Sequence, residues 1–429
     1  MIGVIADDVT GGTDVAAALR RQGLRTQLCF GLPAGLPARY PADATVISLK
    51  TRTSPVLEAV EESRAAARWL IRSGAGQLYF KYCSTFDSTD RGNIGPVLDA
   101  LGEEVADGRP VVTTPSSPEH GRTQYQGYLF VDGVLLAESP MRHHPLTPMR
   151  DSYLPRLLDA QSAHTGCAVL DHTVTAGGSD RIAAALRQHA GHTRYLLADA
   201  LTDADLYAIA RACVELPLLA GAAGLGGALA KVHAERIPSL RDAPASPAPR
   251  PEGPAVALAG SCSRRTLEQI DVMRSAGRPV HPLDPLAEQD PDRLAGQALA
   301  WYDGLGSDAS AAGALIHSSM PPPALRAVQD ALGADRAASI LESTLGRIAT
   351  GLAARGVTRI VVAGGETSGA VVTALGIEGG QVGAEAARGV PWIHTAAGLN
   401  VLLKSGNFGE RDLLLTATAA GATTGRTRA

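Results

Sequence analysis

Two adjacent carboxylates, Asp7 and Asp8, follow the short apolar run Ile2–Ala6 at the start of the chain. Such a run predicts a buried strand. The glycine pair at 11–12 then predicts a flexible turn, and the Ala-rich run Val15–Arg20 predicts a helix. Ligands of open α/β sheets bind outside the carboxyl ends of the strands. The first strand is therefore expected to bring two acids and a turn to a ligand site.

A structural alternative is a capped helix, in which Thr13 or Asp14 is the N-cap and Asp7 or Asp8 is solvated. For a single acid, this alternative would be as good as a ligand role. The pair of acids together with two glycines favours the ligand role, because binding residues concentrate on loops that a rigid scaffold positions.

The most polar segment of the N-terminal half, Lys81–Asn93, follows the strand-like run Leu78–Phe80 and precedes a helix pattern. It combines hydroxyls with a Lys, an Arg, an Asp and an Asn in one loop. These groups suit a small polyhydroxylated anion, since Lys and Arg would hold a carboxylate, and Asp and Asn would bind hydroxyls. The alternative is a solvated loop that caps the next helix. The length and mixed charge of the segment favour a ligand site.

Two further polar segments, 115–123 and 142–149, add Ser, His and Arg side chains. The second contains the adjacent pair His143 and His144. Adjacent histidines could bind a metal, but no other histidines or carboxylates accompany them at ligand spacing. Imidazoles that face an acidic substrate fit the pattern better.

Three Gly/Ser-rich segments of the C-terminal half, 259–263, 363–369 and 404–409, each follow an apolar run. Backbone N–H groups at a helix N-terminus bind phosphate, and Gly lets the backbone approach a ligand closely. One such loop is a weak signal, but three in one domain predict a nucleotide cradle. The chain has no Walker A pattern G-x-x-x-x-G-K-[ST].

The glycine-rich run 221–227 resembles a dinucleotide-binding loop, but its spacing differs from G-x-G-x-x-G. We interpret it as a site of close packing or a structural turn before the last helix pattern of the N-terminal half. The hypothesis of an NAD-dependent oxidoreductase depends on this run. No acidic residue follows the run at a convincing spacing to bind the ribose, which argues against that hypothesis.

Strand and helix patterns alternate along the chain, which is typical of α/β domains with mostly parallel sheets flanked by helices. The N-terminal half has predicted strands at 2–6, 26–30, 45–49, 78–80, 111–114, 168–170 and 195–198, predicted helices at 57–71, 94–101, 180–189 and 204–213, and a hairpin at 128–136 that turns at Asp132–Gly133. The C-terminal half has predicted strands at 255–259, 314–317, 360–363 and 392–395, and predicted helices at 264–275 and 343–354.

A Pro-rich stretch interrupts this alternation and predicts a semi-extended linker at 237–254. The expected organisation is an N-terminal domain at 1–236, the linker, and a C-terminal domain at 255–429. Each domain is expected to have a core of its own.

Composition excludes several classes of function. The net charge of −4 argues against a nucleic-acid surface. Five scattered cysteines without C-x-x-C argue against a disulfide framework or zinc ribbon and favour a cytoplasmic protein. We find no apolar run of membrane-spanning length and no signal-peptide pattern. Only four of the 39 basic residues are Lys, so each Lys is a candidate for a position that needs a compact ammonium.

Taken together, these motifs resemble the four-carbon acid sugar kinase family over nearly the whole chain. The opening Ala6–Gly11 is similar to that family's A-D-D-[LV]-T-G start, and Asp87–Gly95 is similar to its D-S-T-x-R-G-N-I-G string. The segments 364–367 and 404–409 resemble its nucleotide-binding motifs. The segments 81–88 and 144–149 look most like the 3-oxo-tetronate 4-kinase branch. Gly12 is a departure, because the family usually has Ala there.

The resemblance implies transfer of the terminal phosphoryl group of ATP to the C4 hydroxyl of 3-oxo-tetronate. The acid sugar would bind to the N-terminal domain and ATP to the C-terminal domain. Either Asp8 or Asp7 would accept or orient the hydroxyl proton. Mg²⁺ is expected from the chemistry, with Glu366 as a candidate ligand and the remaining ligands unknown. A threonate or erythronate kinase, or a non-catalytic sugar-acid or nucleotide sensor, is the alternative. A homo-oligomer is compatible with the sequence.

The resemblance also implies binding residues in each domain. The expected substrate-binding residues are Thr10, Gly11, Gly12, Asp14, Lys50, Arg52, Lys81, Ser84, Asp87, Ser88, Arg91, Asn93 and His144. The expected ATP-binding residues are Ser261, Ser263, Gly364, Gly365, Glu366, Thr367, Ser368, Lys404, Gly406, Asn407 and Gly409. Within the first set, Lys81 and Arg91, with Lys50 or Arg52, would hold the substrate carboxylate.

Overall fold

The computed structural model describes the chain except for residues 35–41, 145–146, 165, 238–250, 307–312 and 420–429. Contacts divide it into two compact units, Met1–Ser246 and Pro247–Ala429. Most of the predicted linker, 238–250, lies outside the described residues. Of the helices described, none is long and apolar enough to cross a membrane.

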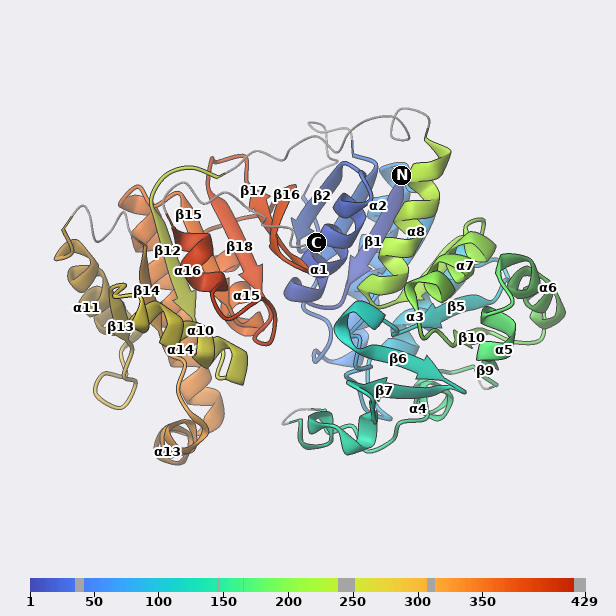
Figure 1. Cartoon of the computed structure of the whole chain (residues 1–429), viewed down its shortest axis with the longest axis horizontal. Helices are drawn as coiled ribbons and strands as arrows, with labels where there is room; N and C mark the ends of the chain where they lie inside the picture. The colour runs from blue at the N-terminus through green and yellow to red at the C-terminus, as the bar shows by residue number, and fades with distance from the viewer. Residues whose placement is uncertain (35–41, 145–146, 165, 238–250, 307–312, 420–429) are drawn as a thin grey trace. The chain divides into compact units, whose positions relative to one another are not determined.

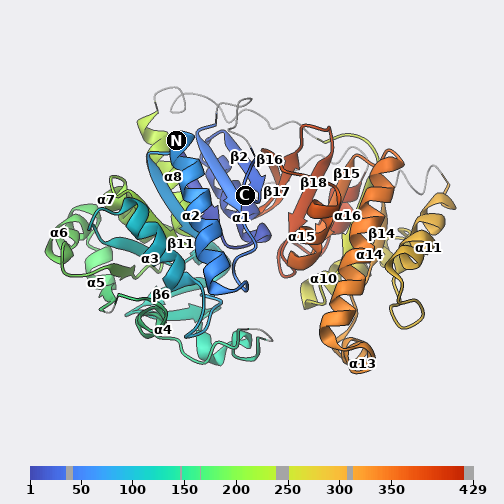
Figure 2. The same cartoon turned by 180° about the vertical axis from the view of Figure 1, so that it is seen from behind.

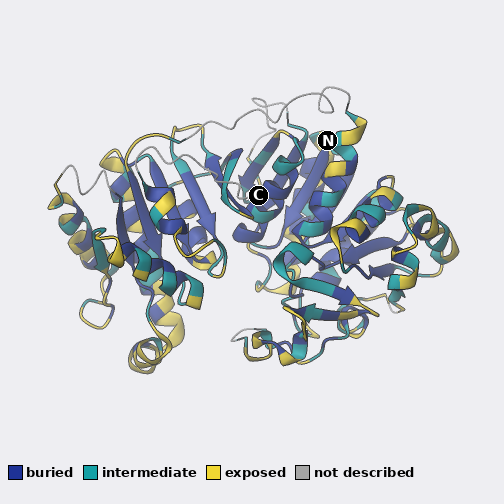
Figure 3. Ribbon diagram, in the orientation of Figure 1, coloured by how far each residue is buried: buried dark blue, intermediate teal, exposed yellow. Residues whose placement is uncertain are grey.

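The first unit contains a parallel sheet with strand order β2-β3-β1-β4-β11-β5-β10-β9 (Figure 1). Its strands are β1 (Ile2–Ala6), β2 (Thr26–Phe30), β3 (Ala44–Ser48), β4 (Gln77–Lys81), β5 (Val111–Thr114), β9 (Ala168–Leu170), β10 (Tyr195–Ala198) and β11 (Leu218–Gly221). Helices lie on both faces, so the strands are largely buried (Figure 3). This arrangement confirms the predicted α/β class for this unit.

Two sets of helices cover this sheet (Figures 1 and 2). One face carries α1 (Val9–Arg21), α8 (Ala223–Arg236), α7 (Asp203–Cys213), α6 (Ser179–His189) and α5 (His172–Thr175). The other carries α2 (Val56–Arg72), α3 (Ile94–Val105) and α4 (Leu154–Gln161). The predicted helices match α2, α3, α6 and α7 to within a few residues at their ends.

Helix α1 differs from its prediction. It begins at Val9 rather than Val15, and its N-cap is Asp8 rather than Thr13 or Asp14. The Asp8 side chain accepts a hydrogen bond from the backbone N–H of Gly11, which satisfies one of the free donors at the helix start. The predicted flexible turn at 11–12 is therefore wrong, because both glycines are helical and buried.

These glycines allow close contacts instead. A Cβ on Gly12 would lie 2.5 Å from Oγ of Ser48, at the end of the neighbouring strand β3. A Cβ on Gly11 would lie 3.0 Å from Nζ of Lys81 and would also collide with the Asp8 carboxylate. Side chains at these positions would push α1 away from the ends of β3 and β4.

The run 221–227 confirms the packing interpretation. It ends β11 and begins α8. A Cβ on Gly226 would lie 2.9 Å from Val15, and one on Gly227 would lie 3.3 Å from Ala18. These two glycines therefore let α8 pack tightly against α1.

A small antiparallel sheet contacts the rest of the first unit through backbone bridges and through a buried carboxylate. It consists of β6 (Arg122–Tyr125), β7 (Tyr128–Val131) and β8 (Val134–Leu135), followed by the 3₁₀ turns η2 (Leu136–Glu138) and η3 (Pro140–His143) and preceded by η1 (Pro118–His120). The predicted hairpin is confirmed, since Asp132 and Gly133 have positive φ angles between β7 and β8. Asp199, fully buried after β10, accepts hydrogen bonds from the Gln124 side chain and from the N–H groups of Gln126, Gly127 and His172.

The second unit contains a mixed sheet with strand order β13-β14-β12-β15-β18-β17-β16. Its strands are β12 (Ala255–Ala259), β13 (Val280–Pro282), β14 (Ala314–His317), β15 (Arg359–Ala363), β16 (Gly379–Ala387), β17 (Val390–His394) and β18 (Asn400–Lys404). The sheet is parallel except for β17, which is antiparallel to both of its neighbours. The unit is therefore α/β with a mostly parallel sheet, as predicted.

Helices again cover both faces of this sheet (Figures 1 and 2). One face carries α10 (Arg264–Ser275) and α16 (Leu413–Thr418), and the other carries α11 (Pro291–Asp303), α14 (Ala334–Ala354) and α15 (Gly365–Ala374), with α13 (Pro322–Leu332) packed on α14. The helix predicted at 343–354 is the second half of α14.

We expect Asp199→Asn to destabilise the protein by about 3 kcal/mol. The Asn NH₂ group would face N–H groups that now donate hydrogen bonds to the Asp199 carboxylate, and donors cannot pair with each other. Denaturant unfolding, compared with the exposed control Asp203→Asn, measures this. A loss under about 0.5 kcal/mol, as expected of the control, would contradict the role given to Asp199.

Candidate active site

The acidic pair lies where the direction of the first sheet's connections reverses. The chain leaves β1 through α1 toward β2 on one side, and leaves β4 through α3 toward β5 on the other. β1 and β4 are neighbours, with Ala6 paired to Lys81. Ligands of open α/β sheets bind in the crevice at such a point. Asp7, Asp8 and Lys81 thus lie at the expected ligand edge.

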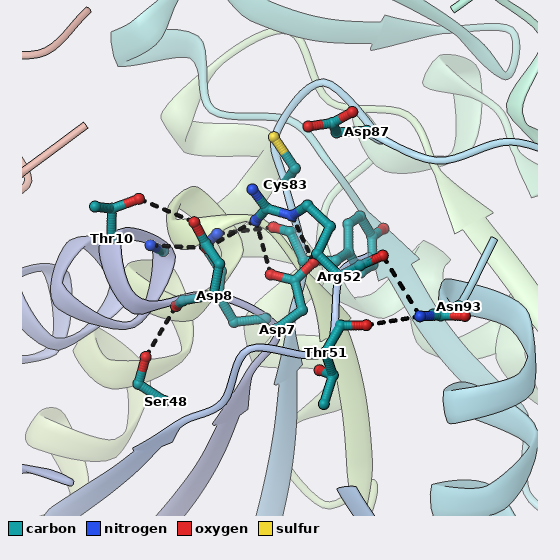
Figure 4. A network of polar contacts seen from close by, with 12 residues as sticks. Asp7, Asp8, Thr10, Ser48, Thr51, Arg52, Cys83, Asp87 and Asn93 are labelled. Carbon is teal, nitrogen blue, oxygen red and sulfur yellow. Dashed lines mark hydrogen bonds and ion pairs between the residues drawn. The ribbon is translucent and has the colours of Figure 1, made fainter. Parts of the chain in front are cut away.

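Arg52 connects the two carboxylates (Figure 4). Its Nε and Nη2 atoms donate to the two oxygens of Asp7 at 3.0 and 2.8 Å, and Nη2 also donates to Asp8 Oδ1 at 2.7 Å. The Asp7 side chain is 6% exposed, whereas that of Asp8 is 24% exposed. Asp8 is therefore the more accessible acid, and Arg52 holds both in place.

The pKa of Asp8 reflects competing effects. Burial alone would raise it, but the charges of Arg52 and Lys81 and hydrogen bonds from Thr10 and Gly11 hold the pKa below its ordinary value. Thr10 Oγ1 donates to Asp8 Oδ2 at 2.9 Å. Asp8 is thus an ionised, oriented acceptor at neutral pH.

Backbone contacts place Arg52 beside the pair. The N–H groups of Thr51 and Arg52 both donate to the carbonyl oxygen of Asp7, at 2.9 and 3.1 Å. The Asn93 side chain donates to the carbonyl oxygens of Thr51 and Ser54, at 2.6 and 2.9 Å. Asn93 therefore holds the segment that carries Arg52.

Lys81 lies under the first turn of α1. Its buried Nζ donates to the Tyr82 carbonyl oxygen at 2.8 Å, its one hydrogen bond among the described residues. The positive charge acts on Asp8 and on Asp14, which lies further along α1. Burial raises the pKa of Asp14 despite this charge. Two ammonium hydrogens are thus left for a ligand.

Asp87 lies near the pair and contacts the segment of His144. Figure 4 shows Asp87 beyond Arg52, on the side of Cys83. Thr147 Oγ1 donates to Asp87, and the same oxygen lies 2.8 Å from His144 Nδ1. Burial raises the pKa of Asp87, the charge of Arg52 opposes this rise, and the nearby Asp7 and Asp8 carboxylates add to it.

Other predicted residues of the first unit have structural contacts or face solvent. Ser88 Oγ accepts a hydrogen bond from Gln161, which also accepts one from the N–H of Gly95. Gln161 therefore fixes the loop, although no sequence signal points to it. Ser84 is half-buried, while Lys50 and Arg91 are exposed. Among the described residues, neither Lys50 nor Arg91 forms a hydrogen bond or an ion pair with Asp7 or Asp8, and their roles stay predictions.

The three Gly/Ser segments of the second unit meet at one sheet edge. β12, β15 and β18 are parallel neighbours, with Ala259 paired to Ala363 and Ala363 paired to Lys404. The segments begin with these residues. A Cβ on Gly364, which has a φ of +130°, would lie 3.1 Å from the N atom of Ser261, and one on Gly406 would lie 2.9 Å from Ser263 Oγ. Gly is therefore needed where the loops touch.

Two helices begin among these loops. Ser263 caps α10 by accepting from the N–H of Thr266. Gly364 precedes α15, whose first turn contains Glu366, Thr367 and Ser368 without a side-chain cap. Uncapped N–H groups at a helix start bind anions. Asn407 and Gly409 follow in the third segment, where the Gln269 side chain donates to the carbonyl oxygen of Phe408.

Lys404 is a fully buried ammonium group. Nζ donates to Thr266 Oγ1 and to the carbonyl oxygens of Ser405 and Gly406, at 2.9–3.1 Å. All three hydrogens are used within the loop, so Lys404 shapes the loop. Burial, with the nearby charge of Arg265, lowers the pKa of Lys404 to about 7.

A cavity of about 170 Å³ adjoins these loops. Most of its lining is apolar and comes from α13 and α14, while the loops border it through Gly260, Cys262, Glu366 and Thr367. The apolar lining residues include Met320, Leu325, Val328, Ala337, Ala338, Leu341 and Leu345. An apolar cavity beside anion-binding loops suits the flat ring and phosphates of a nucleotide.

Carboxylates are sparse around these loops. In the part of the chain that the structure describes, no group of three or more His, Cys, Asp or Glu side chains is arranged to hold a metal ion. Glu366, exposed at the start of α15, and Glu342 of α14 are the two carboxylates among the described residues that line the cavity. One or two carboxylates with substrate phosphates and water can hold Mg²⁺, so this sparse donor set fits that ion.

Comparison with known proteins agrees with a sugar-binding first unit and a nucleotide-binding second unit. Residues 2–229 match the family of sugar-binding N-terminal domains, and residues 256–414 match the family of nucleotide-binding C-terminal domains. Proteins named 3-oxo-tetronate kinase are similar to the chain. One from Burkholderia multivorans is 45% identical, covering 96% of this chain and 95% of its own length. One from Escherichia coli K12 is 45% identical, covering 89% and 97%.

Solved structures agree as well. A crystal structure of a Haemophilus influenzae protein is 39% identical, covers 97% of this chain and 98% of its own, and superposes with a TM-score of 0.79. One from Salmonella typhimurium LT2 is 40% identical, covers 96% and 98%, and has a TM-score of 0.85. The chain belongs to the 3-oxo-tetronate kinase family, with a sugar-binding domain followed by a nucleotide-binding domain.

We expect the stability contributed by Lys404 to depend on pH. The pKa falls from 10.5 to about 7 on folding. Between these values the unfolded chain binds more protons, so the free energy of unfolding rises with pH by up to about 1.4 kcal/mol per unit.

Urea unfolding of wild type and Lys404→Met measures this. The advantage of wild type over the variant should grow between about pH 7 and about pH 9. The exposed Lys231→Met serves as control and should show no such trend. A wild-type advantage independent of pH would contradict the buried ammonium assigned here.

Proposed function

We propose that this protein transfers the terminal phosphoryl group of ATP to the C4 hydroxyl of 3-oxo-tetronate. Its membership of the 3-oxo-tetronate kinase family supports the substrate. The observation that carries the mechanism is the pair Asp7 and Asp8, held by Arg52 at the ligand edge of the first sheet. The acid sugar would bind to a domain at 1–236, and ATP to a domain at 255–429.

Two cations, the buried Lys81 and the partly exposed Arg52, would hold the substrate carboxylate. Lys81 has two free ammonium hydrogens, and Arg52 Nη1 has no hydrogen-bond partner among the residues that the structure describes. Charge-assisted hydrogen bonds from such groups are about twice as strong as neutral ones. An acid sugar therefore fits this site better than a neutral sugar does.

Asp8 would accept or orient the proton of the C4 hydroxyl. Both oxygens of Asp7 are bound to Arg52 in a two-point contact, so Asp7 serves to hold Arg52. Asp8 is more exposed and keeps room on Oδ2, which accepts from Thr10 alone among the described residues. Phosphoryl transfer depends mainly on positioning and charge, and an ionised, oriented carboxylate supplies both.

ATP would bind to the three loops and the adjoining cavity. The segments 260–263, 364–369 and 404–409 would hold the phosphates through backbone N–H groups and hydroxyls. The apolar cavity between α13 and α14 would take the adenine ring. Glu366 would help to hold Mg²⁺ beside the phosphates, and the ion would supply neutralisation of their charge.

Steady-state ADP formation with Mg²⁺ tests the reaction, using 3-oxo-tetronate, both threonates and both erythronates. We expect turnover to prefer 3-oxo-tetronate, and NMR of the product to show phosphate on C4. Preference for a threonate or erythronate would support the kinase activity but contradict 3-oxo-tetronate as the substrate. Absence of ADP with every acid would overturn the proposal and favour a binding protein.

We expect Asp8→Asn to lower kcat by about 10²–10⁴, because the amide cannot accept the hydroxyl proton and Arg52 would lose one partner. The KM for ATP should change little. Asp203→Asn, an exposed carboxylate outside the site, should retain wild-type kcat. Wild-type kcat in Asp8→Asn would exclude Asp8 from this role.

We expect Ala338→Phe to raise the KM for ATP by about tenfold or more with little effect on kcat, since a ring at 338 would fill part of the cavity. Ala327→Phe is the matched control, because Ala327 is exposed on α13 and does not line the cavity. Equal KM values for the two variants would place the adenine ring elsewhere.

A further inference from the structure

Thr147 makes three contacts with the predicted binding residues His144 and Asp87. Its backbone N–H donates to His144 Nδ1 at 3.1 Å. Its hydroxyl oxygen lies 2.8 Å from the same Nδ1 atom and also bonds Asp87 Oδ1. Thr147 lies in the polar segment 142–149, and no sequence pattern indicates its role.

Donor and acceptor rules determine how the hydrogens are arranged. A backbone N–H can act only as a donor, so His144 Nδ1 must be the acceptor and carries no hydrogen. The imidazole is then neutral with its hydrogen on Nε2. The Thr147 hydroxyl has one hydrogen and donates it to the Asp87 carboxylate. This bond anchors Thr147 and thereby keeps its backbone N–H on His144 Nδ1.

Nε2–H of His144 is left for a ligand. It has no hydrogen-bond partner within the described part of the chain, and the His144 side chain is 31% exposed. Asp87 lies 3.7 Å from Nδ1 and belongs to the same site, because its carboxylate interacts with Arg52, Asp7 and Asp8. A substrate held by these residues therefore lies within reach of this segment.

We propose that Thr147 is a positioning residue that holds His144 as an Nε2–H donor, and that this donor recognises the C3 carbonyl oxygen of the substrate. The inference rests on the proposed function. A ketone oxygen can accept a hydrogen bond and cannot donate one. A fixed donor therefore suits the 3-oxo acid, whereas an imidazole free to change tautomer would serve a C3 hydroxyl equally well.

Substitution of Thr147 tests the inference through substrate preference. Thr147→Val keeps the shape but removes the hydroxyl bond to Asp87 that anchors Thr147 and its N–H beside His144, and Thr147→Ser restores that bond. We measure kcat/KM for 3-oxo-tetronate and for the preferred threonate or erythronate. The ratio of the two should fall about tenfold in Thr147→Val and return in Thr147→Ser, with the KM for ATP unchanged.

Thr173→Val is the matched control, since Thr173 Oγ1 donates to the Asp171 carboxylate at the start of α5. An unchanged ratio in Thr147→Val, or the same fall in Thr173→Val, would overturn the inference. A wild type that ignores 3-oxo-tetronate would instead overturn the proposed function.

A second measurement needs no variant and no turnover. The ¹⁵N shifts of His144 in the wild-type protein report which nitrogen carries the hydrogen, with His144→Gln used to assign the signals. We expect the Nε2–H form at neutral pH. The Nδ1–H form, or an equal mixture, would overturn the inference even if Thr147→Val failed to fold.

Discussion

The contact on which the candidate site of the first unit depends is that of the Arg52 guanidinium with Asp7 and Asp8. Two neighbouring carboxylates at the end of a buried strand repel each other and lose solvation. One planar cation with several fixed donors offsets both the repulsion and the lost solvation, and it also sets the orientation of the two carboxylates. A lysine could not make the two-point contact that Arg52 makes with Asp7.

The two units apply the same physical rule to different ligands. In each, strand connections reverse beside the first strand, so the loops after two neighbouring parallel strands face the ligand. In the first unit these loops carry charge, as Asp7 and Lys81 show. In the second they carry small residues and free backbone N–H groups around Gly364. This difference in loop composition matches the different ligands of the two domains. An acid sugar needs cations and hydrogen-bond acceptors, whereas phosphates can be bound by the N–H groups at helix N-termini.

The sequence predicted the parallel sheets, most helices and the positions of the polar loops, because apolar periodicity and loop composition are local signals. It did not predict what Arg52 and Asn93 contact. Asn93 bonds Thr51 across 42 residues of sequence, and such a pairing leaves no local pattern. The start of α1 was also missed, since Gly11 and Gly12 have the composition of a turn. Glycine is needed at these two positions because the ends of β3 and β4 pack against that turn of the helix.

Gly12 and Ser48 illustrate how one close approach joins two distant positions. The Ser48 hydroxyl donates to the carbonyl oxygen of Asp8 at 2.9 Å and fills the space that a side chain at 12 would need. A larger residue at 12 therefore requires a smaller one, or a shifted strand end, at 48. Across the family the two positions should consequently vary together, so that a chain with alanine at 12 has a different residue at 48.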